Sequence, residues 1–142
     1  PSMMPAIAWT PTMSVGVEVL DNDHKILISL INQLDEAMTA DDAYEVIRIV
    51  IGGLVDYTEY HFKREEEMMR ARGYPGVENH CAEHRDIERK IETLRSSYDE
   101  NIIGGFDQRL MDFMRAWLTG HILARDMAYV PFMGRLKSNP ST

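Results

Sequence analysis

Four series of apolar residues, each spaced alternately by three and four positions, constrain the fold of this chain more than any other feature. Because an α-helix turns about 100° per residue, residues with this spacing share one face. The series predict helices over about 21–38, from 43 to Gly73, from 77 to about 101 and from 106 to 121. No run of alternating β-branched residues with hairpin turns competes with them. The sequence therefore predicts an all-α protein.

The expected helices are joined by short connections, which favour antiparallel neighbours. Capping or breaking residues mark the helix ends: Asp21, Asn22 or Asp23 before the first, Asp41 and Asp42 before the second, Gly73 and Pro75 after the second, Gly104 and Gly105 after the third, and Pro131 beyond the fourth. A chain of 142 residues needs no second domain. We expect an antiparallel up-down-up-down four-helix bundle over 21–136, an irregular N-terminal arm over 1–20 and a polar tail over 137–142.

Charge and hydropathy exclude two classes of partner. Lys and Arg number 15 and Asp and Glu number 23, which gives a formal net charge of -8. Nucleic-acid binding needs a surface that neutralises phosphates, so we expect no nucleic-acid partner. The longest apolar stretch, 46–55, is interrupted by Arg48 and is far shorter than the ~20 residues that cross a bilayer. We therefore expect no membrane helix.

The presence of a single cysteine indicates the redox state of the cellular compartment. Cys81 cannot form a disulfide within the chain, so a reducing cytoplasm is the default. The first basic residue is Lys25, and Pro5 and Pro11 interrupt the N-terminal apolar segment, so the features of a signal peptide are missing. We expect a cytoplasmic monomer in which Cys81 is a half-buried thiol and not a metal ligand.

The histidines are the candidate functional residues. All five lie on the faces predicted to point into the core, together with one carboxylate: His24, His61, His80, His84, His121 and Glu65. One histidine on an apolar face is more often a hydrogen-bonded core residue than a ligand. Five histidines at one level of a bundle form a polar cluster that a metal ion would satisfy directly.

Chain connectivity brings these residues to similar levels. His84 and His121 lie about nineteen and eighteen residues from a turn near 103, and Glu65 and His80 lie about nine and six from a turn near 74. His24 and His61 match less well, because a turn at 39–40 leaves a slip of roughly 8 Å between them. A longer first turn or a distortion at Gly52–Gly53 are the two ways to absorb this slip.

The number of candidate ligands indicates two metals. His61 and Glu65, like His80 and His84, are i,i+4 pairs that point the same way from successive helical turns. Zinc takes about three or four protein ligands, and a mononuclear iron site of the two-histidine, one-carboxylate type leaves most of this set unused. Ferritin-like sites use Glu and Glu-x-x-His instead. Asp126 follows His121 by five positions, about 140° around a regular helix, so it joins the cluster only if the helix loosens or ends between them.

The ordered motifs resemble those of the hemerythrins, and more closely the bacterial single-domain members. The resemblance covers about residues 9–130 through these segments: Trp9-Thr-Pro, Ser14-Val-Gly, Asp23-His24-Lys25, His61-Phe-Lys-Arg-Glu65-Glu, Gly73-Tyr-Pro, His80-x-x-x-His84, and His121-Ile-x-x-x-Asp126 followed by Tyr129. In that family two irons share two bridging carboxylates and one bridging oxygen. The resemblance implies two iron ions held by His24, His61, Glu65, His80, His84, His121 and Asp126.

The resemblance also implies an activity. Two roughly octahedral irons offer about twelve positions, and these ligands with the shared oxygen fill all but one. The vacancy suits the family's reversible O2 binding, as a carrier or store, and Tyr57 and Trp117, one turn before ligands, are candidates to line the O2 pocket. No histidine is left to act as a general base, so we do not expect an enzyme. The alternatives are an O2- or redox-sensing domain of a signalling protein and a diiron enzyme that reduces peroxide or nitric oxide.

Overall fold

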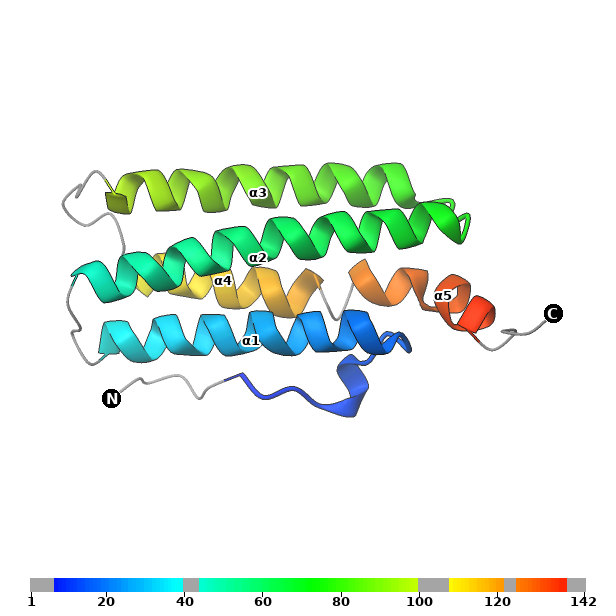
Figure 1. Ribbon diagram of the computed structural model, residues 1–142, viewed down its shortest axis with the longest axis horizontal. Helices are drawn as coiled ribbons and strands as arrows, with labels where there is room; N and C mark the ends of the chain where they lie inside the picture. The colour runs from blue at the N-terminus through cyan, green and yellow to red at the C-terminus, as the bar shows by residue number, and fades with distance from the viewer. Residues whose placement is uncertain (1–6, 40–43, 100–107, 122–124, 138–142) are drawn as a thin grey trace.

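The computed structural model describes residues 7–39, 44–99, 108–121 and 125–137, and its regular elements there are all helical (Figure 1). In chain order they are the 3₁₀ helix η1 (Pro11–Met13), the α-helices α1 (Glu18–Thr39), α2 (Tyr44–Ala71), α3 (Val77–Asp99) and α4 (Gln108–Gly120), the 3₁₀ helix η3 (Asp126–Tyr129) and α5 (Val130–Lys137). The four long helices lie side by side and alternate in direction, while α5 continues beyond α4 (Figure 1). The predicted up-down-up-down bundle is confirmed.

The start of α1 differs from the prediction. The helix begins at Glu18, so the three predicted capping residues lie inside it and not before it. Asp21 accepts hydrogen bonds from the Ser14 hydroxyl at 2.6 Å and from the Val15 amide at 2.8 Å. Its carboxylate in the first turn therefore ties the preceding arm to the helix, and the capping prediction was wrong. The helical residues 18–20 fall in the stretch expected to be an irregular arm.

The first connection lies slightly later in the chain than the turn at 39–40 from which the slip was calculated. Helix α1 ends at Thr39 and α2 begins at Tyr44, while residues 40–43, which include both predicted caps of α2, lie outside the described residues. Centring the turn between these ends reduces the offset of His24 and His61 to about two residues, or roughly 3 Å. Helix α2 stays α-helical through the Gly52–Gly53 pair. The positions of the described ends of α1 and α2, and not a distortion at the glycines, account for most of the slip.

Helix α2 ends where the sequence predicts. Gly73 has a φ of 70°, a left-handed conformation that glycine adopts without a steric penalty. The Tyr74 amide donates to the Met69 carbonyl at 3.0 Å, which satisfies one of the last carbonyls of the helix. Pro131 lies in the first turn of α5, where a missing N–H breaks no helical hydrogen bond. The turn glycines 104–105 and the end of the tail, 138–142, lie outside the described residues.

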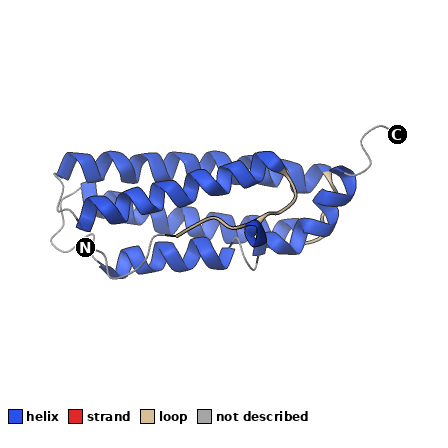
Figure 2. Ribbon diagram, turned by 90° about the horizontal axis from the view of Figure 1, so that it is seen from below, coloured by secondary structure: helices blue, strands red, loops and turns tan. Residues whose placement is uncertain are grey.

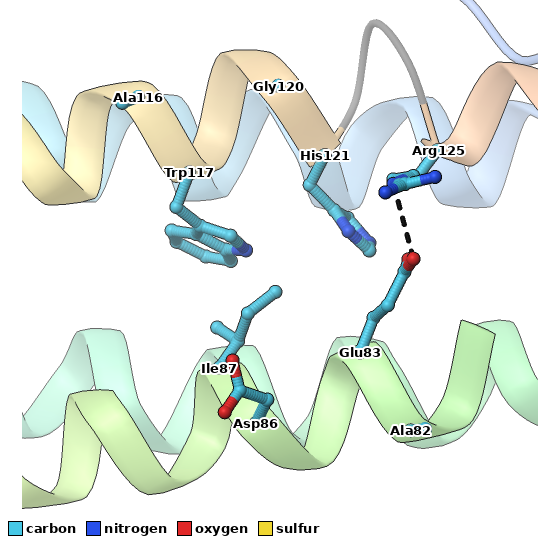
Figure 3. Close-up of a pocket in the computed structure, with 9 residues that line it drawn as sticks. All are labelled: Ala82, Glu83, Asp86, Ile87, Ala116, Trp117, Gly120, His121 and Arg125. Atoms are coloured by element: carbon cyan, nitrogen blue, oxygen red, sulfur yellow. Dashed lines mark ion pairs between the residues drawn. The ribbon is translucent and has the colours of Figure 1, made fainter. Parts of the chain in front are cut away.

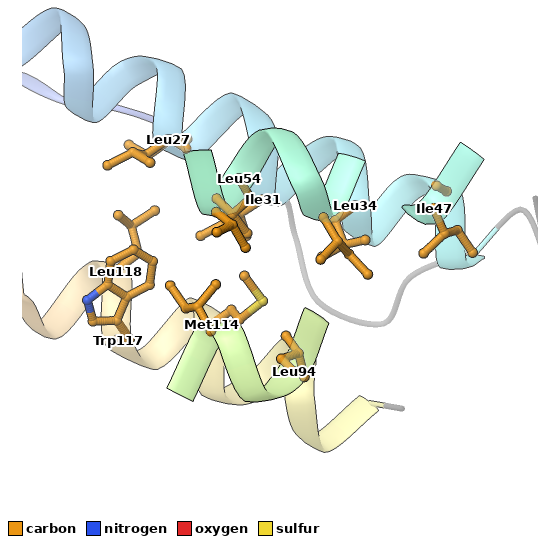
Figure 4. Packing of buried hydrophobic residues seen from close by; sticks show 14 of the residues in the cluster. Leu27, Ile31, Leu34, Ile47, Leu54, Leu94, Met114, Trp117 and Leu118 are labelled. Carbon is orange, nitrogen blue, oxygen red and sulfur yellow. The ribbon is translucent and has the colours of Figure 1, made fainter. Parts of the chain in front are cut away.

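Two apolar clusters pack the bundle on either side of a polar layer. The larger one contains Leu27, Ile31, Leu54, Phe62, Met114 and Leu118 (Figure 4). The smaller one joins Val15, Leu20, Met69, Tyr129 and Met133. Each fully buried aliphatic or aromatic side chain of this size contributes about 1.5–3 kcal/mol. Along α1, His24 lies between Leu20 and Leu27, so the histidine layer separates the two clusters.

The N-terminal arm is attached to α1. The side-chain amide of Asn32 accepts a hydrogen bond from the Ile7 amide at 3.0 Å and donates one to the Ile7 carbonyl at 2.8 Å. Trp9 packs against the larger cluster, and the ammonium of Lys25 lies 4.3 Å from its ring centroid. The arm therefore runs along the outside of the bundle (Figure 2). None of the described helices is long and apolar enough to cross a membrane.

Candidate metal centre

All seven predicted ligand residues are buried and meet in one layer of the bundle. Helix α1 supplies His24, α2 supplies His61 and Glu65, α3 supplies His80 and His84, and His121 and Asp126 follow from the end of α4 to η3. Each histidine directs its Nε2 atom toward one or both of the carboxylates Glu65 and Asp126. Helical spacing predicts this convergence for the five histidines and Glu65, whereas Asp126 was expected only from the family resemblance.

Asp126 reaches the cluster through a change of helical form. His121 and Arg125 have π-helical conformation, and a 3₁₀ helix follows from Asp126; residues 122–124 between them lie outside the described residues. A π-turn has more residues per turn than an α-helix, so it brings residues five apart to one face. The Nε2 atom of His121 lies 2.9 Å from Oδ1 of Asp126. The described residues on both sides of 122–124 therefore depart from the regular α-helix, as this spacing requires.

The seven residues form two groups that share both carboxylates. The first comprises His80, His84 and His121 with Glu65 and Asp126, and the second comprises His24 and His61 with Glu65 and Asp126. Within each group one possible ligand atom per residue lies within 4.8 Å of every other. Two carboxylates common to two sets of donors are what a pair of neighbouring metal ions needs.

In the first group each histidine lies close to a carboxylate oxygen. The Nε2 atom of His80 is 3.0 Å from Oδ1 of Asp126, and that of His84 is 3.0 Å from Oε1 of Glu65. In the second group, Nε2 of His24 is 3.0 Å from Oδ2 of Asp126, and Nε2 of His61 is 3.4 Å from Oε2 of Glu65. Each carboxylate thus turns one oxygen toward each group.

Burial and neighbouring charges shift the pKa values of these residues in opposite directions. Burial lowers the pKa of His24, His80 and His121, but hydrogen bonds with and attraction to Asp126 and Glu65 outweigh it and raise the pKa to about 9, 9 and 10. Burial raises the pKa of Glu65, but the surrounding histidines lower it well below its usual range. Without metal, the cluster is therefore held together by protonated imidazoles facing carboxylates.

Several buried atoms in this layer lie 3.0–3.4 Å from a possible ion-pair partner but make no hydrogen bond of good geometry with the described part of the chain. They include Nε2 of His24, Nε2 of His61, Oε1 of Glu65 and Oδ2 of Asp126. Burying a polar atom without a well-formed hydrogen bond is unfavourable, even where an oppositely charged group is near. All four atoms are types that bind transition metals. The donor set therefore fits metal ions better than it fits a purely hydrogen-bonded core.

Sequence reasoning missed two carboxylates beside this layer. Asp23, expected only as a helix cap, has Oδ2 at 2.9 Å from Nδ1 of His61. Oε2 of Glu66 is 2.7 Å from Nδ1 of His84. Both carboxylates are buried. Tyr129, quoted above only as part of a motif, donates its hydroxyl to Oε2 of Glu65 at 2.6 Å.

Tyr57 and Trp117, the two aromatic residues predicted to line an O2 pocket, have different surroundings. Tyr57 donates its hydroxyl to Oδ1 of Asp23 at 2.6 Å, so that its polar end is directed to the carboxylate behind His61. Trp117 lines a surface pocket between α3 and α4 with Ile87 and His121 (Figure 3). Their role in an O2 pocket stays a prediction. Cys81 is buried and not half-buried as expected, because its sulfur lies on the side of α3 that faces α2, 3.6 Å from Nη2 of Arg70; it belongs to neither ligand group.

An ion pair joins two residues that line the same surface pocket, Glu83 on α3 and Arg125. Nε of Arg125 lies 3.2 Å from Oε2 of Glu83 (Figure 3). His121 also lines this pocket and is 6% exposed. One edge of the histidine layer is therefore close to solvent.

The fold and the site define a class of protein: a four-helix bundle with a buried cluster of histidines and carboxylates that could hold metal. The family profile described as "Hemerythrin HHE cation binding domain" matches residues 15–133. The chain belongs to the hemerythrin family.

Relatives support this assignment along most of the chain. It is 32% identical to a bacteriohemerythrin of Stenotrophomonas maltophilia over 128 residues, which cover 89% of this chain and 80% of that one. It is 29% identical to a bacteriohemerythrin of Clostridium acetobutylicum, with coverage of 86% and 97%. A crystal structure of wild-type hemerythrin superposes with a TM-score of 0.81 at 29% identity and covers 92% of this chain and 99% of that chain.

Proposed function

We propose that this protein binds O2 reversibly, as a carrier or store, at a pair of non-haem iron ions. Membership of the hemerythrin family supports this function. The observation that carries it is the pair of ligand groups, which share Glu65 and Asp126 but hold three and two histidines. The group with fewer histidines leaves one position for a small ligand.

The proposed ligands are His80, His84 and His121 for one iron, His24 and His61 for the other, and Glu65 and Asp126 as bridges. When bound, the iron pair supplies the electrons that O2 accepts reversibly. The imidazoles must be neutral at Nε2 to act as ligands, so loading the site displaces protons. The orphaned atoms of His24, His61, Glu65 and Asp126 support this assignment, since a metal ion gives each of them a partner.

The apolar clusters limit the access of water to the site. Phe62 stacks on the His84 ring with a centroid distance of 3.7 Å and an interplanar angle of 2°. Trp117 meets Phe62 edge to face at 6.2 Å. A dry site favours binding and release of O2 over hydrolysis or irreversible oxidation.

We propose a binding protein and not an enzyme, because all five histidines of the chain lie in the cluster and no other imidazole is available as a general base. We further propose a monomer in a reducing cytoplasm with O2 as its partner, without nucleic acid or membrane. The single buried thiol and the net charge of -8 support these points.

Visible absorption during anaerobic reduction and re-exposure to air tests the proposal. The reduced protein should be nearly colourless, become coloured with O2 and return to colourless when O2 is removed. His61→Leu takes one ligand from the two-histidine group and should abolish the cycle, whereas Asp112→Ala, which changes an exposed carboxylate, should retain it. One-way oxidation on the first exposure would favour an enzyme or redox sensor instead.

A further inference from the structure

One histidine from each ligand group is bonded at its outer nitrogen to a buried carboxylate that belongs to neither group. Nδ1 of His61 lies 2.9 Å from Oδ2 of Asp23, and Nδ1 of His84 lies 2.7 Å from Oε2 of Glu66. By contrast, Nδ1 of His24 is buried and makes no hydrogen bond with any described residue. His61 and His84 therefore differ from His24 in this contact.

Asp23 is held in place from several sides. It accepts a hydrogen bond from the Tyr57 hydroxyl at 2.6 Å, and its Oδ2 lies 3.1 Å from Nε of Arg64. The carboxylate is almost fully buried, while the side chain of Arg64 is 28% exposed. The guanidinium thus compensates the buried charge from the surface side of the helix pair.

Glu66 is held in the same manner in the other half of the site. Nη2 of Arg85 lies 2.6 Å from the same Oε2 atom that meets His84. Arg85 is half-exposed and also pairs with Glu88 on its own helix. Each arrangement therefore runs from an inner histidine through a buried carboxylate to an arginine at the surface.

These contacts fix which nitrogen faces the centre. A carboxylate only accepts hydrogen bonds, so the proton of a neutral imidazole must lie on the Nδ1 atom that meets it. The lone pair is then on Nε2, which lies 3.4 Å from Oε2 of Glu65 in His61 and 3.0 Å from Oε1 of Glu65 in His84. A charged acceptor also makes the imidazole a stronger electron donor at Nε2.

We propose that Asp23 and Glu66 are positioning residues for the metal centre, one for each ligand group. Each holds its histidine with Nε2 directed to the metal, strengthens the ligand, and so favours the more oxidised state of the iron. The proposal rests on the diiron assignment made above. Arg64 and Arg85 support it from outside, because each forms an ion pair with one of these buried carboxylates.

Asp23→Asn and Glu66→Gln test the proposal, because each keeps the size of the side chain and removes its charge. The measurements are the rate of iron loss to a ferrous chelator and the midpoint potential of the iron pair. We expect iron loss to be about 10–100 times faster in each variant and the midpoint potential to become more positive. Loss of a carboxylate that touches no ligand should change neither the rate of iron loss nor the midpoint potential.

Asp35→Asn is the matched control. Asp35 is a buried carboxylate that pairs with Arg115 at 2.7 Å and belongs to neither ligand group. This variant should unfold at a lower temperature in its metal-free form but keep the parent iron-loss rate and potential. Equal metal readouts in Asp23→Asn, Glu66→Gln and the parent would overturn the proposal, as would equal shifts in all three variants.

Arg64→Gln and Arg85→Gln provide a second route if the carboxylate variants fail to fold. Both arginines are partly exposed, so their replacement leaves the buried layer intact. We expect faster iron loss and a more positive midpoint potential, with smaller changes than in the carboxylate variants. Parent values of both quantities in both arginine variants would again overturn the proposal. A parent that holds two irons but binds no O2 contradicts the proposed function alone, whereas a parent that binds no iron contradicts both.

Discussion

The Nε2 atoms of His84 and His121 lie 3.1 Å apart, although these residues come from antiparallel helices and are 37 positions apart in the chain. Both atoms are also near Oε1 of Glu65, at 3.0 Å and 3.8 Å. Two imidazole nitrogens at this separation either share one proton or bind one metal ion. The orphaned atoms elsewhere in the layer favour the metal.

The first prediction concerns metal content. Because one iron cannot use five histidines, metal analysis of the protein as purified should find about two irons per chain. His84→Ala and His121→Ala act on the same ligand group and should reduce this value, while Asp112→Ala should not. A value of one zinc and no iron would contradict the diiron assignment.

The second prediction concerns pH and the metal-free protein. The pKa values of His24, His80 and His121 are raised from 6.5 to about 9, 9 and 10. Their contribution to stability is thus complete below pH 6.5 and is lost as pH rises through 9–10. The pKa values of Glu65 and Asp126 are lowered, so the contribution of these carboxylates to stability has the opposite pH dependence. It is present at neutral pH and is lost only as pH falls below their ordinary pKa range.

Urea denaturation of the metal-free protein between pH 6 and pH 10 measures this effect. We expect the free energy of unfolding to decrease over this range, and His121→Gln, which removes one raised pKa, should flatten the curve. With iron bound the trend reverses, because the imidazoles must lose protons to bind metal. Full retention of iron at pH 4, or a metal-free protein that gains stability toward pH 10, would contradict this linkage.

The third prediction concerns Phe62, which is fully buried and stacks on His84. Phe62→Ala should reduce the free energy of unfolding by about 3–5 kcal/mol and leave space beside a proposed ligand. The O2 complex should then oxidise faster because water reaches the site. Phe113→Ala changes a partly buried aromatic farther along the bundle and should not alter the oxidation rate, which stopped-flow absorption would measure.

Helical periodicity predicted much of this arrangement, for reasons visible in single residues. His61 and Glu65 are i,i+4 neighbours, so the spacing alone puts both on one face. Asp126 could be placed only through the family resemblance, because its spacing from His121 fits the cluster only where the helix becomes wider. Asp23 and Glu66 each adjoin a ligand in sequence and point about 100° away from it on a regular helix, so no periodic pattern marks them.

The last prediction tests whether Asp126 is a bridging metal ligand. Asp126 is buried, and its Oδ1 and Oδ2 atoms face different ligand groups, at 2.9 Å from His121 and at 3.0 Å from His24. If Asp126 bridges the two irons, Asp126→Ala removes one ligand atom from each and admits water. Iron should be easier to extract and the O2 complex shorter-lived, with effects similar to those of Glu65→Ala.

The comparison with Glu65 makes this test specific, because both variants remove a buried carboxylate from the same layer. Asp35→Ala also removes a buried carboxylate, but one that pairs with Arg115, so it should lower stability without releasing iron. Iron content, the visible spectrum and the rate of oxidation in air are the measurements. Parent values for all three in Asp126→Ala would leave Glu65 as the single bridging carboxylate and assign Asp126 to hydrogen bonding with His80 and His121 alone.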